Sequence, residues 1–393
     1  MENREREIQN VLNSLPTQSL NAVNRLRQMG PPAVPALVVA LKHPDPVIRA
    51  GAARALARMK EPGGAPALAA AADDPESSVR LAAVLALAEI PGLAAVRALA
   101  EALHARHGLV RDCAARALAR RSLAALRAAL CDPDPVARAA AAHGLGYYAR
   151  DRVSIPRLRA LLRDPSADVR RMAVRSLAWI APRHAPALDA LLEALQHEDE
   201  EIRAMAAQCL GRVGSPAAVD ALVSSLRDPS KRVAEAAIRA LGAEDAEAPG
   251  RRAGVGDGRA LPALLALVRG GDPDLRAAAL GALAHILAAE PDGPHDPATL
   301  STLLTALADP DPRVRAAAAA AAGESRDPAA AAALIQALED PAWSVRASAA
   351  SALAILADPS AIPALEAARQ DPDLAVARHA EQALQQIRSR RGA

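Results

Sequence analysis

The stretch DPSADVRRMAVRSLAWI, at residues 164–180, joins an Asp-Pro turn to a segment with helical periodicity. An aspartate readily caps the start of a helix, and a proline is tolerated in the first turn. After the turn, Val169, Ala173, Leu177 and Ile180 lie three or four residues apart, so they would share one face of a helix. One helix cannot cover such an apolar stripe alone, so the stretch predicts packing against neighbouring helices.

Variants of this phrase recur along the chain of 393 residues, for example at 43–59 (HPDPVIRAGAARALARM), 74–90 (DPESSVRLAAVLALAEI) and 340–356 (DPAWSVRASAASALAIL). Nine copies share a recurring arginine near the start of the helical segment that follows the turn: Arg49, Arg80, Arg111, Arg138, Arg170, Arg203, Arg276, Arg315 and Arg346. Ala234 and Ala377 take this place in two further copies, which makes eleven copies with a base period of 31 residues. Self-similarity at such a period indicates a solenoid of stacked repeats.

Each copy predicts two helices, a short one such as 33–43 (AVPALVVALKH) and the longer one that carries the recurring arginine. The chain is 51% hydrophobic, mostly alanine and leucine, and it contains no phenylalanine. Alanine-rich helices can approach closely and stack in thin layers. We therefore expect an all-α fold.

The Asp-Pro turn, the Val-Arg pair and the AAxALG pattern of the second helix resemble the short bacterial HEAT repeats also found in relatives of phycobilisome lyases. The resemblance covers roughly residues 32–388. It implies a right-handed α-α superhelix of about eleven helix pairs, in which the turn aspartate and the recurring arginine form a ladder between adjacent repeats. Ala234 and Ala377 would interrupt that ladder, which predicts weaker stacking at these two places.

The sequence divides into four expected parts. These are an N-terminal helical cap at 1–31, repeats one to seven with a basic concave face at 32–242, a loop insertion at 243–258, and repeats eight to eleven with a C-terminal cap at 259–393. Thr17 is the candidate N-cap of a helix in the first part. A second long loop is expected at 288–298, because this segment also gathers glycine, proline and charged residues.

Charge is unevenly distributed, although the net charge is only +2. Residues 1–240 carry 33 basic and 25 acidic residues, or +8, whereas residues 241–393 carry 14 and 20, or −6. In HEAT-type folds the second helices line the concave face, and helical spacing turns positions one, five and nine after the recurring arginine outward. The candidate partner-binding residues on this face are Arg54, Arg58, Arg116, Arg120, His143, Tyr147, Arg171, Arg175, Trp179, Arg212 and Arg239.

Trp179 and Tyr147 occupy the same position in consecutive repeats, so their rings would lie about 10 Å apart or closer. Arginine and aromatic residues together are typical of binding hot spots. The simpler interpretation is that Trp179 fills a packing gap and that the arginines are only solvated. The concentration of arginine in the first seven copies favours a binding surface.

Catalytic signatures are missing from the sequence, which has no phosphate-binding loop, dinucleotide fingerprint or GxSxG motif. His104 and His107 lack a third ligand nearby, and the His197–Glu198 pair falls in a repeat turn. HEAT-fold hydroxylases hold two irons with several His-Glu pairs, and this is the only such pair here. We therefore expect no enzyme activity, cofactor or metal.

Three functions remain. The leading hypothesis is a protein-interaction scaffold whose arginine-rich groove binds an acidic partner. The second is nucleic-acid binding by the same groove, as in HEAT-like DNA glycosylases, although the small net charge and the scarcity of lysine argue against it. The third is a bilin lyase or chromophore chaperone, which rests on the resemblance alone.

The three cysteines are far apart and odd in number, which favours a reducing compartment. The polar N-terminal sequence lacks the apolar stretch of a signal peptide, and no uncharged apolar run reaches the roughly 20 residues of a membrane helix. We expect a cytoplasmic, monomeric protein without membrane contact.

Overall fold

The computed structural model describes residues 25–242, 257–289 and 297–391, together with Glu7, Asn10, Val11 and Asn21. The predictions for most of the N-terminal cap, including the Thr17 N-cap, lie outside the described residues. So do those for nearly all of the loop at 243–258 and for 290–296 of the second loop.

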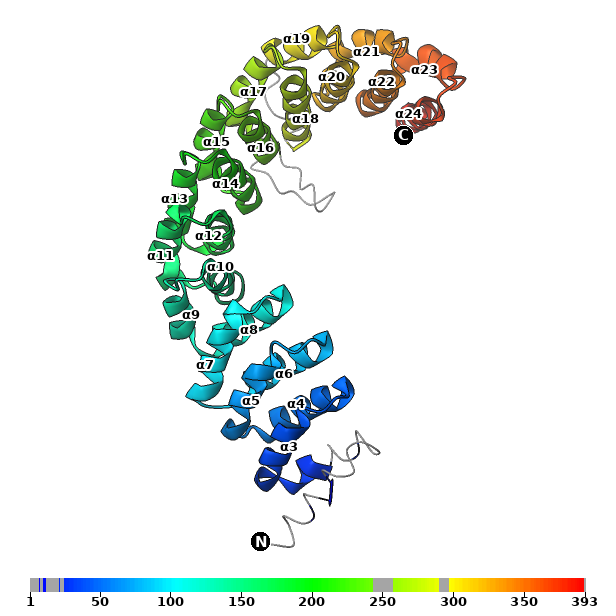
Figure 1. Ribbon diagram of the computed structural model, residues 1–393. Coiled ribbons are helices and arrows are strands. Elements are labelled where there is room, and N and C mark those ends of the chain that lie inside the picture. The colour runs from blue at the N-terminus through cyan, green and yellow to red at the C-terminus, as the bar shows by residue number, and fades with distance from the viewer. Residues whose placement is uncertain are drawn as a thin grey trace. The chain divides into compact units, whose positions relative to one another are not determined.

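The described residues form eleven helix pairs and contain no strand, which confirms the all-α architecture of stacked pairs (Figure 1). The first helices are α3 (Val34–Ala40), α5 (Ala65–Ala71), α7 (Leu93–Glu101), α9 (Leu123–Ala129), α11 (Ile155–Ala160), α13 (Ala185–Ala194), α15 (Val219–Ser225), α17 (Leu261–Val268), α19 (Pro297–Ala306), α21 (Ala331–Ala337) and α23 (Ile362–Ala368). The second helices are α4 (Pro46–Met59), α6 (Ser77–Glu89), α8 (Gly108–Arg121), α10 (Pro135–His143), α12 (Ala167–Ile180), α14 (Glu200–Val213), α16 (Lys231–Leu241), α18 (Pro273–Ala289), α20 (Pro312–Glu324), α22 (Trp343–Leu356) and α24 (Leu374–Arg391).

An aspartate caps several of the second helices. The prediction of this cap is wrong for the stretch 164–180, where α12 begins at Ala167 after Ser166, whose side chain makes no capping bond, and Asp164 belongs to the turn. At α4, the side chain of Asp45 accepts a hydrogen bond from the backbone N–H of Val47 at 2.8 Å, and Pro46 is the first helical residue. Asp134, Asp199 and Asp311 cap their helices in the same way. The capping residue is therefore the second acid of a turn such as DPDP, while the first acid has another role.

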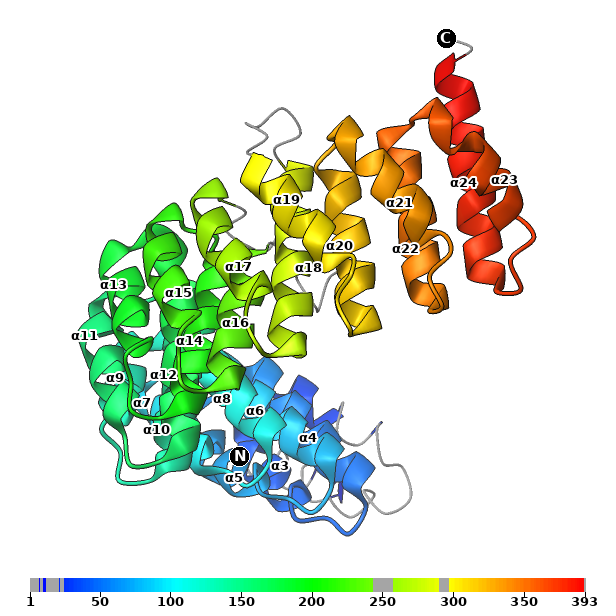
Figure 2. The ribbon, with the colours of Figure 1, turned by 90° about the horizontal axis from the view of Figure 1, so that it is seen from above.

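Two compact units divide the chain, residues 1–190 and 191–393, here called unit 1 and unit 2. Within unit 1, α4, α6, α8, α10 and α12 lie side by side on one face, and the first helices lie behind them (Figure 1). We call this the second-helix face. Within unit 2, α18, α20, α22 and α24 form a corresponding row (Figure 2).

The first aspartate of the turn binds the recurring arginine of the preceding repeat. Arg315, for example, donates to Asp340 from Nε at 2.7 Å and from Nη2 at 2.9 Å. Its Nη1 donates to the carbonyls of Asp309 and Pro310, so one guanidinium joins its own turn to the next repeat. This Arg–Asp ladder recurs in six pairs: Arg49–Asp74, Arg138–Asp164, Arg203–Asp228, Arg276–Asp309, Arg315–Asp340 and Arg346–Asp371. The structural role expected for the recurring arginines is confirmed in these pairs.

At Ala234 the ladder is modified. Lys231, one turn earlier, places its Nζ 3.0 Å from the Asp272 carboxylate and also contacts Asp274. Even so, α16 contacts α18 less extensively than α14 contacts α16, as the missing arginine predicts. For the other interruption, at Ala377 in α24, the described residues include no further repeat against which the prediction could be tested.

A further interruption lies between the second and third repeats, and the recurring arginines do not reveal it. Ala105 stands where the turn aspartate would accept from Arg80. Arg80 donates to the carbonyls of Asp74 and Pro75 but has no ion pair within the described residues. Accordingly, α6 contacts α8 less extensively than it contacts α4.

Small residues let other second helices approach closely. A Cβ on Gly323 of α20 would lie 2.6 Å from the Cβ of Ala352 of α22, and one on Gly146 would lie 2.5 Å from the Cα of Ser176 in α12. Both distances are too short for carbon atoms in contact, so these positions require glycine.

Candidate partner-binding groove

The predicted site residues lie on the second helices or on the turn that directly follows α10. The solvent-exposed ones are Arg54, Arg58, Arg116, Arg120, Tyr147, Arg175, Arg212 and Arg239. His143, Arg171 and Trp179 are half-buried. The outward orientation is therefore confirmed, whereas partner binding stays a prediction. Arg212 and Arg239 belong to unit 2, so the site is described from the nine residues of unit 1.

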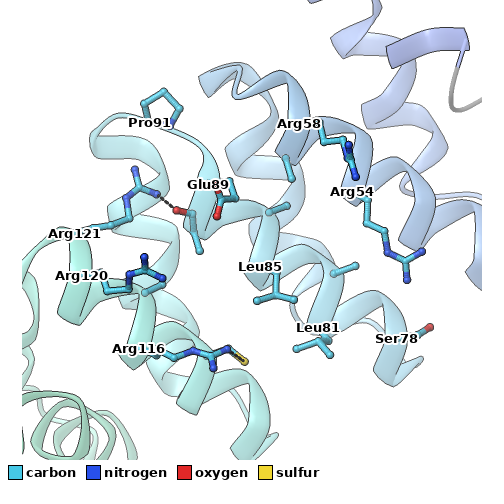
Figure 3. A pocket seen from close by; sticks show the side chains of 16 residues that line it. Arg54, Arg58, Ser78, Leu81, Leu85, Glu89, Pro91, Arg116, Arg120 and Arg121 are labelled. Atoms are coloured by element: carbon cyan, nitrogen blue, oxygen red, sulfur yellow. Dashed lines mark hydrogen bonds between the residues drawn. The ribbon is translucent and has the colours of Figure 1, made fainter. Parts of the chain in front are cut away.

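A groove of about 960 Å³ lies over α4, α6 and α8. Two leucines one turn apart, Leu81 and Leu85, point into it from α6, and 44% of Leu85 is exposed (Figure 3). Leu85 is the fifth residue after Arg80, so helical spacing turns it outward, but it is not among the predicted binding residues. Arginines from the two neighbouring helices flank this apolar strip: Arg54 and Arg58 of α4, and Arg116 and Arg120 of α8.

The groove is strongly basic, since five arginines and one acid, Glu89, line it. Arg54, Arg58 and Arg120 make no hydrogen bond or ion pair with any described residue, and Arg116 has only a weak contact with the sulfur of Cys113 at 3.6 Å. A guanidinium carries five N–H donors. The groove therefore presents N–H donors that are free to bind a ligand. The arginines of the six ladder pairs are already engaged, because they donate to their own turn and to the aspartate of the next repeat.

The fifth arginine, Arg121, links two of the helices that form the groove. It donates from Nη1 to the carbonyls of Leu87 and Ala88, and from Nη2 to the carbonyl of Ile90, all at the end of α6. Helix ends have carbonyls without a partner in the helix, and a cation near them is favourable. Arg121 thus joins α8 to α6 from the side, in the repeat junction that lacks its ladder aspartate.

Aromatic residues cluster farther along the same face. The Trp179 ring centroid lies 4.9 Å from that of Tyr147 and 5.4 Å from that of His143, and Tyr148 lies 5.0 Å from Tyr147. The predicted pairing of Trp179 with Tyr147 is confirmed. Trp179 packs against its neighbours, while 51% of Tyr147 remains exposed, so the cluster combines packing with an accessible ring.

The cluster depends on a π-helical turn, η4 (Gly144–Ala149), which continues α10. The step from Arg138 to Arg170 is one residue longer than the base period, and a π-turn accommodates one extra residue. In this geometry His143 contacts both Tyr147 and Tyr148, four and five residues later. The long step was visible in the sequence, but its consequence for Tyr148 was not inferred.

Asp112 of α8 anchors this cluster from the neighbouring repeat. It accepts a hydrogen bond from the Tyr148 hydroxyl at 2.8 Å and lies 3.3 Å from Nδ1 of His143. Burial and the bond to Asp112 together raise the pKa of Tyr148 to about 12. Burial also lowers the pKa of His143, so this ring is neutral at physiological pH and stacks as an uncharged aromatic.

A second cavity, of about 440 Å³, lies between α8, α10 and α12. Arg171 and Arg175 line it together with Asp112 and Asp168. Arg171 is paired with Asp168, so its charge is partly compensated. Of the six predicted arginines of unit 1, four therefore line the groove over α4, α6 and α8 without an ion pair to any described residue, and Arg175 is the one without such a pair in this second cavity.

Comparison with known families agrees with this architecture. The family model described as HEAT repeats matches residues 17–88, 123–195, 155–242, 188–284 and 300–385, which together make up more than half of the chain. The chain belongs to the HEAT-repeat family.

Solved structures with similar HEAT solenoids include karyopherins. Kap121p matches with a TM-score of 0.63 and 15% identity over 98% of this chain and 49% of that chain. Importin beta in an ammonium sulfate condition matches with a TM-score of 0.58 and 18% identity over 98% of this chain and 56% of that chain. Yeast importin-beta (Kap95p) matches with a TM-score of 0.52 and 18% identity over 96% of this chain and 58% of that chain. This HEAT chain spans about half the length of those proteins, and at such identity the likeness shows the fold alone. None of the curated proteins compared matches its sequence significantly.

His104, considered above as a possible metal ligand, makes a contact between HEAT repeats. His104 lies 3.1 Å from Asp132, the turn aspartate of the next repeat. Among the described residues, no three His, Cys, Asp or Glu side chains are placed to hold a metal ion. A search of the same residues for a helix long and apolar enough to cross a membrane found none.

Proposed function

We propose that this HEAT-repeat protein is a non-enzymatic scaffold that binds an acidic segment of a protein partner in the groove over α4, α6 and α8. The observation that carries the proposal is the arrangement of Arg54, Arg58, Arg116 and Arg120 around an exposed apolar strip. The ladder arginines are fully occupied by structural bonds, whereas these four are available to a ligand.

The type of ligand follows from this chemistry. Carboxylates accept bidentate hydrogen bonds from guanidinium groups, and complementary charge accelerates the encounter of two proteins. Protein ligands are also known for similar folds, since Kap121p is seen bound to Nup53p and Kap95p forms a complex with Nup1. These observations support a protein partner without identifying it.

Nucleic acid is the second candidate, because Tyr147 is exposed beside Trp179, and Arg175 is exposed one turn before Trp179 on α12. Exposed rings next to arginine can stack on unpaired bases. The net charge of +2 and the absence of lysine from the groove lining make this candidate weaker.

We also propose that the protein acts as a monomer in the cytoplasm. Its three cysteines, Cys113, Cys131 and Cys209, are unpaired, which suits a reducing compartment.

A binding titration tests the main proposal. Fluorescein-labelled polyglutamate, duplex DNA and single-stranded DNA are titrated with the protein over a salt series, and fluorescence polarisation is recorded. The test variant is Arg54→Glu/Arg116→Glu. The matched control is Arg152→Glu/Arg163→Glu, which makes the same charge change at exposed positions outside the groove.

We expect polyglutamate to bind, the groove variant to lose at least tenfold in affinity, and the control to change less than threefold. Equal losses in both variants would show that only overall charge matters and would refute the groove. Tighter binding of either DNA than of polyglutamate, lost in the groove variant and falling steeply with salt, would establish the second candidate instead.

A further inference from the structure

The groove carries three parallel rows of side chains (Figure 3). The middle row is apolar and consists of Leu81 and Leu85, one turn apart on α6. Each outer row is basic and also spans one turn: Arg54 and Arg58 on α4, and Arg116 and Arg120 on α8. The order across the groove is therefore basic, apolar, basic.

A partner that complements all three rows needs an apolar row between two acidic rows on a single side. A helix provides this, because its residues three and four apart form adjacent rows on one face. A strand directs alternate residues to opposite sides, so it would present only one row to the groove. An unstructured acidic chain would satisfy the arginines but would leave Leu81 and Leu85 uncovered.

The spacing within the rows agrees with a helix. Residues four apart on an α-helix are separated by about 6 Å along its axis, and the two residues of each row are four apart. A helical segment of about two turns therefore reaches both residues of each row.

We propose that the partner segment is an acidic amphipathic helix that docks its apolar stripe on Leu81 and Leu85 and its flanking carboxylates on the two arginine rows. This inference rests on the proposed function and narrows it from an acidic segment to one of defined secondary structure. The mode of recognition is a helix in a groove. Glu89 continues the middle row beyond Leu85 and is the one acid in the lining, so it repels an acidic residue there.

The test uses the full chain and three labelled peptides about five turns long. The first has leucines along one face and glutamates on both flanks of that stripe. The second has the same composition, scrambled so that the leucines do not share a face. The third has the first pattern with lysine in place of glutamate.

The test variant is Leu85→Ser, which removes exposed apolar surface without a change of charge. Leu93→Ser is the matched control, because Leu93 is 75% exposed and lies outside the groove lining. Circular dichroism and thermal unfolding confirm that both variants remain folded.

We expect the amphipathic acidic peptide to become helical on binding and to bind at least tenfold more tightly than the scrambled peptide. Leu85→Ser should weaken it at least fivefold, Leu93→Ser should not, and Glu89→Gln should strengthen it. The lysine peptide should not bind.

Equal affinity for the amphipathic and scrambled peptides, or no effect of Leu85→Ser, would overturn the helix proposal. The proposed function would still stand if Arg54→Glu/Arg116→Glu weakened polyglutamate binding. If that variant had no effect on any acidic ligand, the proposed function would fail as well.

Discussion

The guanidinium of Arg315 in α20 forms a bidentate pair with the carboxylate of Asp340, which lies at the turn before α22. Both side chains are largely buried, with 14% and 11% of their surface exposed. Removal of one partner leaves the other charge poorly solvated. We expect Arg315→Ala to lower the free energy of unfolding by about 2–3 kcal/mol. Urea denaturation measures this, with Arg378→Ala as an exposed control that should change it by less than about 0.5 kcal/mol.

The ladder also predicts the response to acid. Hydrogen bonds from the recurring arginines lower the pKa of Asp228, Asp340 and Asp371 below the ordinary value of 3.8. A carboxylate with a lowered pKa in the folded state stabilises that state fully above its unfolded pKa, and the stabilisation is lost as the pH falls through the folded value. The melting temperature should therefore be steady above about pH 5 and fall steeply below about pH 4.

Asp340→Asn checks the origin of that fall. The variant should melt at a lower temperature than the wild type at neutral pH and should lose less between neutral pH and about pH 2. An unchanged pH dependence in this variant would mean that Asp340 does not contribute.

Two helical glycines with different surroundings should respond in opposite ways to alanine. Gly323→Ala would place a Cβ 2.6 Å from that of Ala352 and should destabilise the protein by about 1–3 kcal/mol. Gly281→Ala, in the middle of α18, meets nothing within 4 Å and should stabilise it by about 0.5–1 kcal/mol, because alanine favours the helix. Thermal unfolding of both variants compares the signs, and a stabilising Gly323→Ala would contradict the contact.

The bond between Tyr148 and Asp112 predicts a late tyrosine titration. The pKa of Tyr148 is raised to about 12, so the wild type should show a tyrosinate absorbance step near this pH that Tyr148→Phe lacks. Asp112→Asn keeps an acceptor but removes the negative charge, so the step should move to lower pH. Ultraviolet absorbance titration measures both, provided that circular dichroism shows the protein still folded at that pH.

The sequence predicted the repeats because each contributes the same turn and the same apolar stripe, and such local signals do not depend on the rest of the fold. The positions of Arg54, Arg116 and Trp179 on exposed or half-buried parts of their helices followed from helical spacing alone. The features that the sequence did not predict depend on contacts between repeats. Nothing near Ala105 indicates that Arg121 binds the carbonyls at the end of α6.

The sequence did not predict that a lysine–aspartate pair replaces the arginine–aspartate pair at Ala234. Lys231 reaches Asp272 from one turn before Ala234, and the distance to that carboxylate depends on how α16 and α18 pack. Leu85 was placed outward but was not chosen, because a single exposed leucine is common on protein surfaces. Its significance comes from the arginines on both sides, which belong to other repeats.

The bonds of Arg121 bear on how the junction between α6 and α8 resists tension. Neighbouring repeats transmit tension one junction at a time. The junction between α6 and α8 has carbonyl bonds from a single side chain, whereas the junctions on either side of α20, for example, have an arginine–carboxylate pair. A molecule pulled at its ends would yield early at this junction, beneath the groove. A ligand that spans α4, α6 and α8 would add contacts across this junction. Occupancy of the groove would therefore raise the force needed to separate α6 from α8.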